Sequence, residues 1–94
     1  MIEWTEQATR QLDRAHGYIA LSNSDEIAAL ITMHIATSVQ QLATFTMLGR
    51  SGRVPGTREL VISNSPFFVA YRIEKERIVI LAIYHGAQQW PEVL

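Results

Sequence analysis

The sequence predicts an α+β fold in which a helical hairpin packs on one face of a small antiparallel sheet. In the first half of the 94-residue chain, apolar residues recur every three or four positions, as they do along one side of a helix. In the second half they recur every second position, as they do along one face of a strand. Glycines and a proline at residues 49–56 separate the halves. The length is that of one domain, so we expect a single domain over residues 1–94.

A first helix is expected to follow a short N-terminal strand at residues 1–4. Thr5 is a suitable N-cap, and Glu6 places negative charge in the first turn, where the helix dipole favours it. Four apolar residues at steps of three and four should face the core: Ala8, Leu12, Ala15 and Ile19.

A second, longer helix should begin after a turn at residues 21–24. Asn23, with Glu26 three residues later, resembles a capping box. The helix should end near Met47, because glycine and proline residues follow closely. The two helices would form the hairpin. The expected core-facing residues of the second helix are Ile27, Ile31, Ile35, Val39 and Leu42.

Three strands that form an antiparallel meander are expected in the second half. Residues 59–63 place Leu60 and Ile62 on one face, and residues 67–73 alternate between two faces. Residues 74–76 form a polar turn. Residues 77–85 are apolar on both faces in their middle, which predicts a covered, central strand.

Composition argues against several classes of function. The formal net charge of −1 does not indicate a chain that binds polyanions as a whole. There is no cysteine and no signal peptide, and the longest apolar stretch, residues 78–84, is too short to span a bilayer. We therefore expect a cytoplasmic protein with no membrane partner. The three histidines lack metal-ligand spacing, and the glycine-rich loop lacks the ending of a phosphate-binding loop, so neither a metal nor another cofactor is expected.

The charge is unevenly distributed along the chain. No Asp or Glu occurs from Ile27 to Arg58, whereas Arg50, Arg53 and Arg58 fall within nine residues. Arginine pairs well with phosphate and carboxylate groups. This pattern is consistent with a basic patch for nucleic acid, a basic patch for an acidic protein, or a solvated loop.

His85 is expected at the end of the last strand, where an imidazole could act as an acid or base near neutral pH. Cleavage of a phosphodiester would also need cations held against the phosphate. Arg58 and Arg72 could join His85 in that role only if the fold brings them together; singly, each is more often a surface or salt-bridge residue. Near the C-terminus, Trp90 would either pin the tail to the core or anchor a partner.

An ordered set of segments resembles the RelE/ParE superfamily of bacterial toxins: residues 52–61, 67–73, 78–81 and 85–91, with Trp4 and the Tyr18-Ile19 pair. The resemblance covers essentially the whole chain. It implies the toxin of a type II toxin–antitoxin module, which serves plasmid maintenance or growth arrest. Its partner in a hetero-oligomer would be a cognate antitoxin that neutralises it, and operator DNA would be bound only through that antitoxin.

The superfamily divides by target. RelE-type members cut messenger RNA on the ribosome, and commonly carry an arginine where Phe68 stands here and a tyrosine near the position of Leu94. ParE-type members inhibit DNA gyrase, and the ending from His85 to Pro91 resembles theirs more closely. We therefore predict a gyrase inhibitor that is not an enzyme. The alternatives are a ribosome-dependent endoribonuclease that uses Arg58, Arg72 and His85, and a toxin that has lost its activity.

Two sets of binding residues follow from these predictions. The candidates for contact with the target are Arg50, Arg53, Arg58, His85, Gln88 and Trp90. The antitoxin is expected to cover an exposed apolar strip, for which the candidates are Phe67, Phe68 and the outer face of the helical hairpin.

Overall fold

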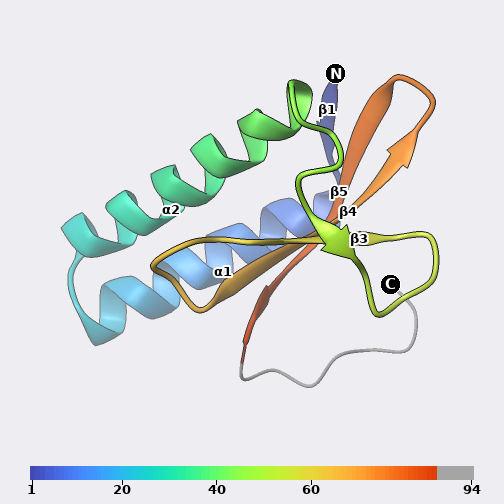
Figure 1. The fold of residues 1–94 in the computed structure, drawn as a ribbon. Helices are drawn as coiled ribbons and strands as arrows, with labels where there is room; N and C mark the ends of the chain where they lie inside the picture. The colour runs from blue at the N-terminus through green and yellow to red at the C-terminus, as the bar shows by residue number, and fades with distance from the viewer. Residues whose placement is uncertain (87–94) are drawn as a thin grey trace.

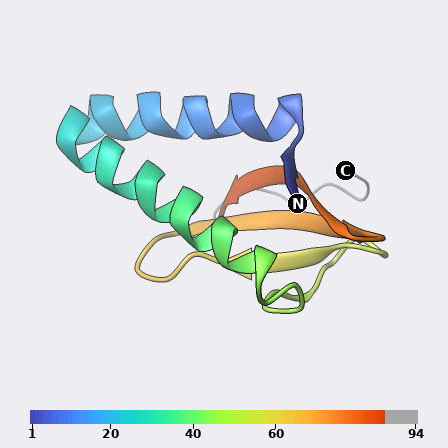
Figure 2. The same ribbon diagram turned by 90° about the horizontal axis from the view of Figure 1, so that it is seen from above.

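Two helices cover one face of a five-stranded sheet in the computed structural model, which describes residues 1–86 (Figures 1 and 2). This confirms the predicted α+β class. The elements in chain order are β1 (Ile2–Trp4), α1 (Glu6–Ser22), α2 (Asp25–Gln40), a 3₁₀ turn η1 (Gln41–Ala43), β2 (Arg50–Ser51), β3 (Arg58–Val61), β4 (Phe67–Glu74) and β5 (Arg77–His85).

The sheet has the strand order β1-β5-β4-β3-β2 and is mixed, whereas a purely antiparallel sheet was expected. β3, β4 and β5 form the predicted meander, but β1 joins it in parallel, with Ile2 opposite Ile78. β2 adds an edge strand, with Arg50 opposite Glu59. It was not predicted because two polar residues show no alternation. β5 lies between β1 and β4, which confirms the predicted central position of this strand in the sheet.

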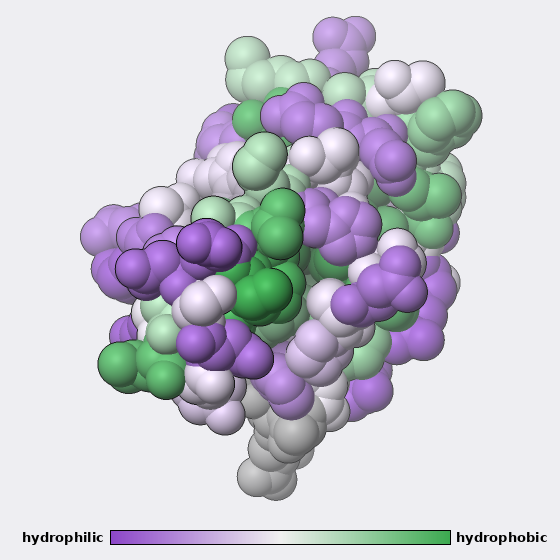
Figure 3. Space-filling view, turned by 90° about the vertical axis from the view of Figure 1, so that its left-hand side faces the viewer, coloured by the Kyte–Doolittle hydropathy of each residue, from purple (hydrophilic) through white to green (hydrophobic). Residues whose placement is uncertain are grey.

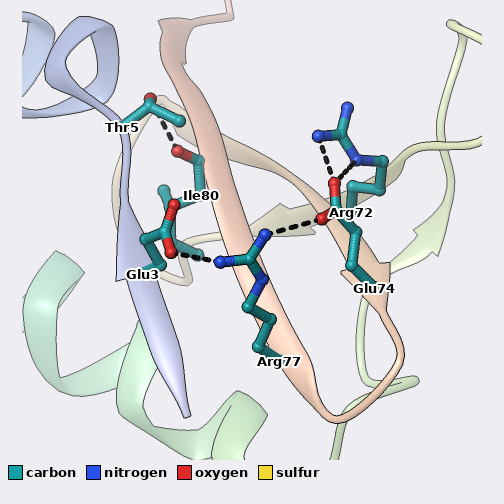
Figure 4. Close-up of polar contacts among 6 residues, drawn as sticks. All are labelled: Glu3, Thr5, Arg72, Glu74, Arg77 and Ile80. Carbon is teal, nitrogen blue, oxygen red and sulfur yellow. Dashed lines mark hydrogen bonds and ion pairs between the residues drawn. The ribbon is translucent and has the colours of Figure 1, made fainter.

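The start of α1 is joined to β5 through Thr5. Its side chain accepts a hydrogen bond from the N–H of Ala8 at 3.1 Å, as expected of an N-cap. The same hydroxyl donates to the carbonyl of Ile80 at 2.8 Å, and the Thr5 N–H donates to that carbonyl at 3.1 Å (Figure 4). The predicted stripe is confirmed, because Ala8 and Ile19 are buried and the two residues between them pack against the core.

α2 begins one residue later than predicted. Ser24, and not Asn23, is the N-cap, and its hydroxyl accepts from the N–H of Ile27. Asn23 instead ends α1, since its N–H donates to the carbonyl of Ile19. α2 ends at Gln40 and passes into η1, well before Met47. At its start the core-facing position is Ala28, whereas Ile27 is exposed; Ile35, Val39 and Leu42 are buried as predicted.

A bulge in β5 sets which residues face the helices. The residue opposite Ala70 is Ala82, but the residue opposite Tyr71 is Ile80, so Leu81 is the additional residue. Ile78, Ile80 and Ile83 consequently all join the main core, although their spacing is not strictly two. Ala82 and Tyr84 form a small buried cluster with Ala70 on the other face. Both faces of β5 are therefore apolar.

An ion-pair network joins the N-terminal strand to the turn between β4 and β5 (Figure 4). The guanidinium of Arg77 donates to Glu3 Oε1 at 2.6 Å and to Glu74 Oε1 at 3.0 Å, and Arg72 pairs with the other oxygen of Glu74. Hydrogen bonds from Arg77 and then Arg72 lower the pKa of Glu74 below its ordinary value. The network connects β1, β4 and β5 at one end of the sheet.

Replacing Arg77 with methionine should raise the pKa of Glu74 toward its ordinary value, because the largest stabilising contact of the carboxylate is removed. A carboxylate whose pKa is lower in the folded than in the unfolded state stabilises the folded protein at pH values above the pKa of the unfolded state. That contribution is lost as the pH falls through the folded pKa. Titration of the Glu74 side-chain carboxyl by ¹³C NMR measures the shift. Arg10→Met, which removes an ion pair with Glu6 on α1, is the control; equal Glu74 midpoints in the wild type and Arg77→Met would contradict the assignment.

Candidate functional site

The loop between α2 and β3 is attached to the core by Tyr71, a fully buried residue of β4. Its hydroxyl donates to the carbonyl of Thr46 at 2.8 Å and accepts from the N–H of Gly49 at 2.9 Å. A Cβ at residue 49 would lie 2.7 Å from Tyr71 Cε1 and 2.8 Å from the carbonyl oxygen of Glu59. The close approach therefore requires glycine at this position.

The predicted target-binding arginines make contacts with this loop and with the start of β3. Arg58 donates through Nε to the carbonyl of Gly49 at 2.9 Å and through Nη2 to that of Met47 at 3.3 Å. Arg50 Nη2 pairs with Glu59 Oε1 at 3.3 Å, and Glu59 is only 2% exposed. The other oxygen of Glu59 accepts from the backbone N–H of Arg53 at 2.8 Å. The arginines thus shape the loop as well as giving it positive charge.

The glycine-rich part of the loop is a compact turn, which is the structural role that its glycines and proline suggest. The N–H of Gly52 donates to the carbonyl of Thr57 at 2.8 Å, and the Thr57 hydroxyl donates to the carbonyl of Val54 at 2.6 Å. A Cβ at residue 52 would lie 2.2 Å from that hydroxyl oxygen. Gly56 has a φ of 82°, which favours glycine.

The three residues considered for phosphodiester cleavage are not brought together. His85 lies opposite Phe67, on the face of the sheet that carries the helices, and the two rings meet edge to face at 5.5 Å. Arg72 lies on the other face and near the other end of β5, opposite Val79, where it pairs with Glu74. Arg58 is on the helix face but bonds the carbonyls of the loop. They therefore do not converge on a common point.

A groove beside His85 was not predicted. It has a volume of about 420 Å³ and lies between α1 and the end of β5. There Gln11 Oε1 accepts from the N–H of Ile83 at 2.8 Å, beyond the part of β5 that pairs with β1. The groove is lined by Gln11, Arg14, Ala15, Tyr18, Phe67, Ile83 and His85. The spacing of Gln11, Arg14 and Tyr18 indicates that they lie on one side of the helix and could form one wall of a groove. The sequence did not show which strand they would face.

The two candidate antitoxin residues lie on opposite faces of β4. Phe67 belongs to the main core, whereas Phe68 is half-buried on the other face, with the Arg50 guanidinium carbon 5.5 Å from its ring centroid. They do not form one continuous strip. Two further candidates for contact with the target, Gln88 and Trp90, lie outside the described residues.

Apart from Met1 and Val61, the large exposed apolar side chains of residues 1–86 lie in two places. One is the hairpin, with Tyr18, Leu21, Ile27, Leu30 and Met33. The other is the segment after η1, with Phe45, Met47 and Leu48. Figure 3 shows hydrophobic surface in the middle of one face, bordered by hydrophilic residues.

Within residues 1–86, no three His, Cys, Asp or Glu side chains are grouped in a way that could hold a metal ion. None of the helices in that range is long and apolar enough to cross a membrane.

Comparison with known proteins gives three consistent findings. A family model described as "ParE toxin of type II toxin-antitoxin system, parDE" matches residues 2–90. The protein named "Putative toxin Y4kP" of Sinorhizobium fredii is 42% identical over 93 residues, which are 99% of this chain and 95% of that protein. A solved structure of the chromosomal ParDE toxin–antitoxin system from P. aeruginosa is similar with a TM-score of 0.83 and 28% identity. That match covers 89% of this chain and 92% of the other.

Replacing Tyr71 with phenylalanine should destabilise the protein by about 1–3 kcal/mol, because the buried Gly49 N–H and Thr46 carbonyl lose their partner. The free energy of unfolding in urea measures the effect. Tyr18→Phe, at an exposed tyrosine of α1, is the matched control and should be near neutral. Equal stability of the two variants would show that the hydroxyl of Tyr71 does not hold the loop.

Proposed function

Because this chain belongs to the ParE toxin family of type II toxin–antitoxin systems, we propose that it arrests growth by binding DNA gyrase and that a cognate antitoxin neutralises it. The site of action would be the cytoplasm, where gyrase acts on DNA. The toxin would bind its target as a protein ligand and would not use a catalytic centre of its own. Operator DNA would be contacted only through the antitoxin.

The placement of Arg72 and His85 favours this proposal over messenger RNA cleavage. A nuclease would need its acid or base and its phosphate-binding cations around one phosphate. Here His85 faces α1 across the groove, while Arg72 is held by Glu74 on the other face of the sheet. A phosphate bound at either residue would be out of reach of the other.

We assign gyrase contact to the basic end of the molecule, which includes Arg50, Arg53 and Arg58. The nearest carboxylate in the sequence, that of Glu59 in β3, is buried and paired with Arg50, so the loop carries net positive charge. Positive charge would attract an acidic surface on a protein and increase the rate of association. His85, with Gln88 and Trp90 beyond it, remains a second proposed contact.

We assign antitoxin contact to the outer face of the hairpin and the groove beside α1. The hairpin exposes several large apolar residues, and Tyr18 belongs both to that face and to the groove. Phe67 would take part only as a wall of the groove. An amphipathic segment of the antitoxin could bury this apolar surface, and its binding would also stabilise the folded toxin by mass action.

Purified toxin should inhibit DNA supercoiling by gyrase and leave message intact in a reconstituted translation reaction. Arg72→Ala is the discriminating variant, since Arg72 belongs to the proposed nuclease set and not to the gyrase set. It should arrest growth as strongly as the wild type, because only an exposed ion pair is lost. Growth arrest after induction and supercoiling gels measure both effects.

Codon-phased cuts in translated message, lost in Arg72→Ala, would contradict the gyrase proposal and establish the nuclease. Harmless overexpression of the wild type, with normal supercoiling and intact message, would indicate an inactive toxin.

Replacing Leu30 with lysine should weaken binding of the antitoxin encoded by the neighbouring gene by at least about tenfold, because a charge would enter an apolar interface. Calorimetric titration of the toxin with that antitoxin measures the dissociation constant. Lys75→Leu, in the turn between β4 and β5, is a control outside the hairpin. Unchanged affinity in Leu30→Lys would place the antitoxin elsewhere.

A further inference from the structure

The segment of residues 45–48, here called the apolar loop, exposes three large apolar side chains within four positions. Phe45 and Met47 are 62% exposed and Leu48 is 48% exposed. Leu48 also lines a hollow of about 330 Å³ together with Arg50 and the exposed Val61 of β3, so apolar surface continues from the loop onto the sheet edge. Figure 2 shows the chain after α2 curling at the margin of the sheet. We propose that the apolar loop is the element with which this toxin enters an apolar, acid-rimmed pocket on its protein target.

The backbone of the apolar loop is fixed before any partner binds. The Thr46 carbonyl accepts from the buried Tyr71 hydroxyl, and the Met47 carbonyl accepts from Arg58. The Leu48 N–H donates to the carbonyl of Phe45 at 3.1 Å, which closes a turn within the segment. A backbone that is already ordered loses little further conformational entropy on binding, which lowers the cost of association.

The surroundings of the apolar loop determine the charge of the partner. Arg50, Arg53 and Arg58 lie in the segment that follows it, and no acidic residue occurs from residue 27 to residue 58. Glu59, the first carboxylate after that range, is buried against Arg50. A pocket that receives the loop should therefore carry carboxylates at its rim, where they would face these arginines.

The contacts of the arginines favour a protein over a nucleic acid. Nucleic-acid binding depends mainly on cations that reach phosphates. Here the guanidinium of Arg58 bonds two backbone carbonyls of the apolar loop and its neighbour, and that of Arg50 bonds Glu59. Phe45 and Met47 make no such polar contact through their side chains, and both are 62% exposed. The identity of the target as gyrase rests on the proposed function above, whereas the position of the contact is argued from the structure alone.

The test is binding of immobilised gyrase to wild-type toxin, Phe45→Ala, Met47→Gln and Met33→Gln. Met47 and Met33 are a matched pair, since they are 62% and 64% exposed on different surfaces and undergo the same change. We expect Phe45→Ala to weaken gyrase binding about thirtyfold and Met47→Gln about tenfold, while Met33→Gln binds as the wild type does. Half-maximal inhibition of supercoiling should shift in the same order. Thermal unfolding of all three variants should match the wild type, because each altered side chain is exposed.

Each remaining outcome overturns a different statement. If wild-type toxin does not bind gyrase, the proposed function fails. If it binds gyrase and the Phe45 and Met47 variants bind equally well, only the apolar loop is excluded and the proposed function stands. Weaker binding in Met33→Gln alone would move the contact to the hairpin. Tight binding of the toxin alone to a short DNA duplex, weakened by Met47→Gln, would overturn the assignment of the loop to a protein pocket.

Discussion

The bulge at Leu81 determines the arrangement of both faces of this small domain. Up to Ile80, β5 pairs with β1 on one side and β4 on the other; beyond the bulge, α1 takes the place of β1 along that edge. Where β1 gives way to α1, the Thr5 hydroxyl donates to the carbonyls of Ile80 and Leu81, and the Gln7 side chain also donates to that of Leu81. The additional residue shifts the alternation so that Ile83 and His85 face the helix. The core, the groove and the position of His85 all depend on this one irregularity.

The sequence predicted the elements whose residues repeat, and also the short strand at residues 1–4, but it missed the pairing of that strand with β5 and the edge strand β2. The stripe on α1 and the strand at residues 77–85 were found because burial requires a regular apolar pattern. The parallel addition of β1 and the two-residue β2 carry no such pattern. The cap of α2 was misplaced by one residue because Asn23 and Ser24 are both good capping residues, and only the closure of α1 by Asn23 decides between them.

The candidate site was predicted in composition but not in geometry. The arginines at positions 50, 53 and 58 lie close together in the sequence, but the sequence could not show that Glu59 would contact Arg50 or that two backbone carbonyls would contact Arg58. Residues 45–48 were overlooked because the second helix was expected to continue to about Met47. The helix ends at Gln40, and the 3₁₀ turn that follows leaves their side chains outside the core. Exposure, unlike hydrophobicity, is a property of the whole fold.

The position of β1 has a consequence for synthesis of the protein. Ile2 pairs with Ile78, and the Met1 carbonyl accepts from the N–H of Ile78. β1 therefore cannot pair until β5 has been synthesised. Until β5 has left the ribosome, β1 has no strand to pair with and one edge of β4 is open. α1 also lacks the strand against which it packs. Contacts between residues so distant along the chain form slowly. The sheet can therefore close only after β5 has left the ribosome, and no fully folded domain exists before that point.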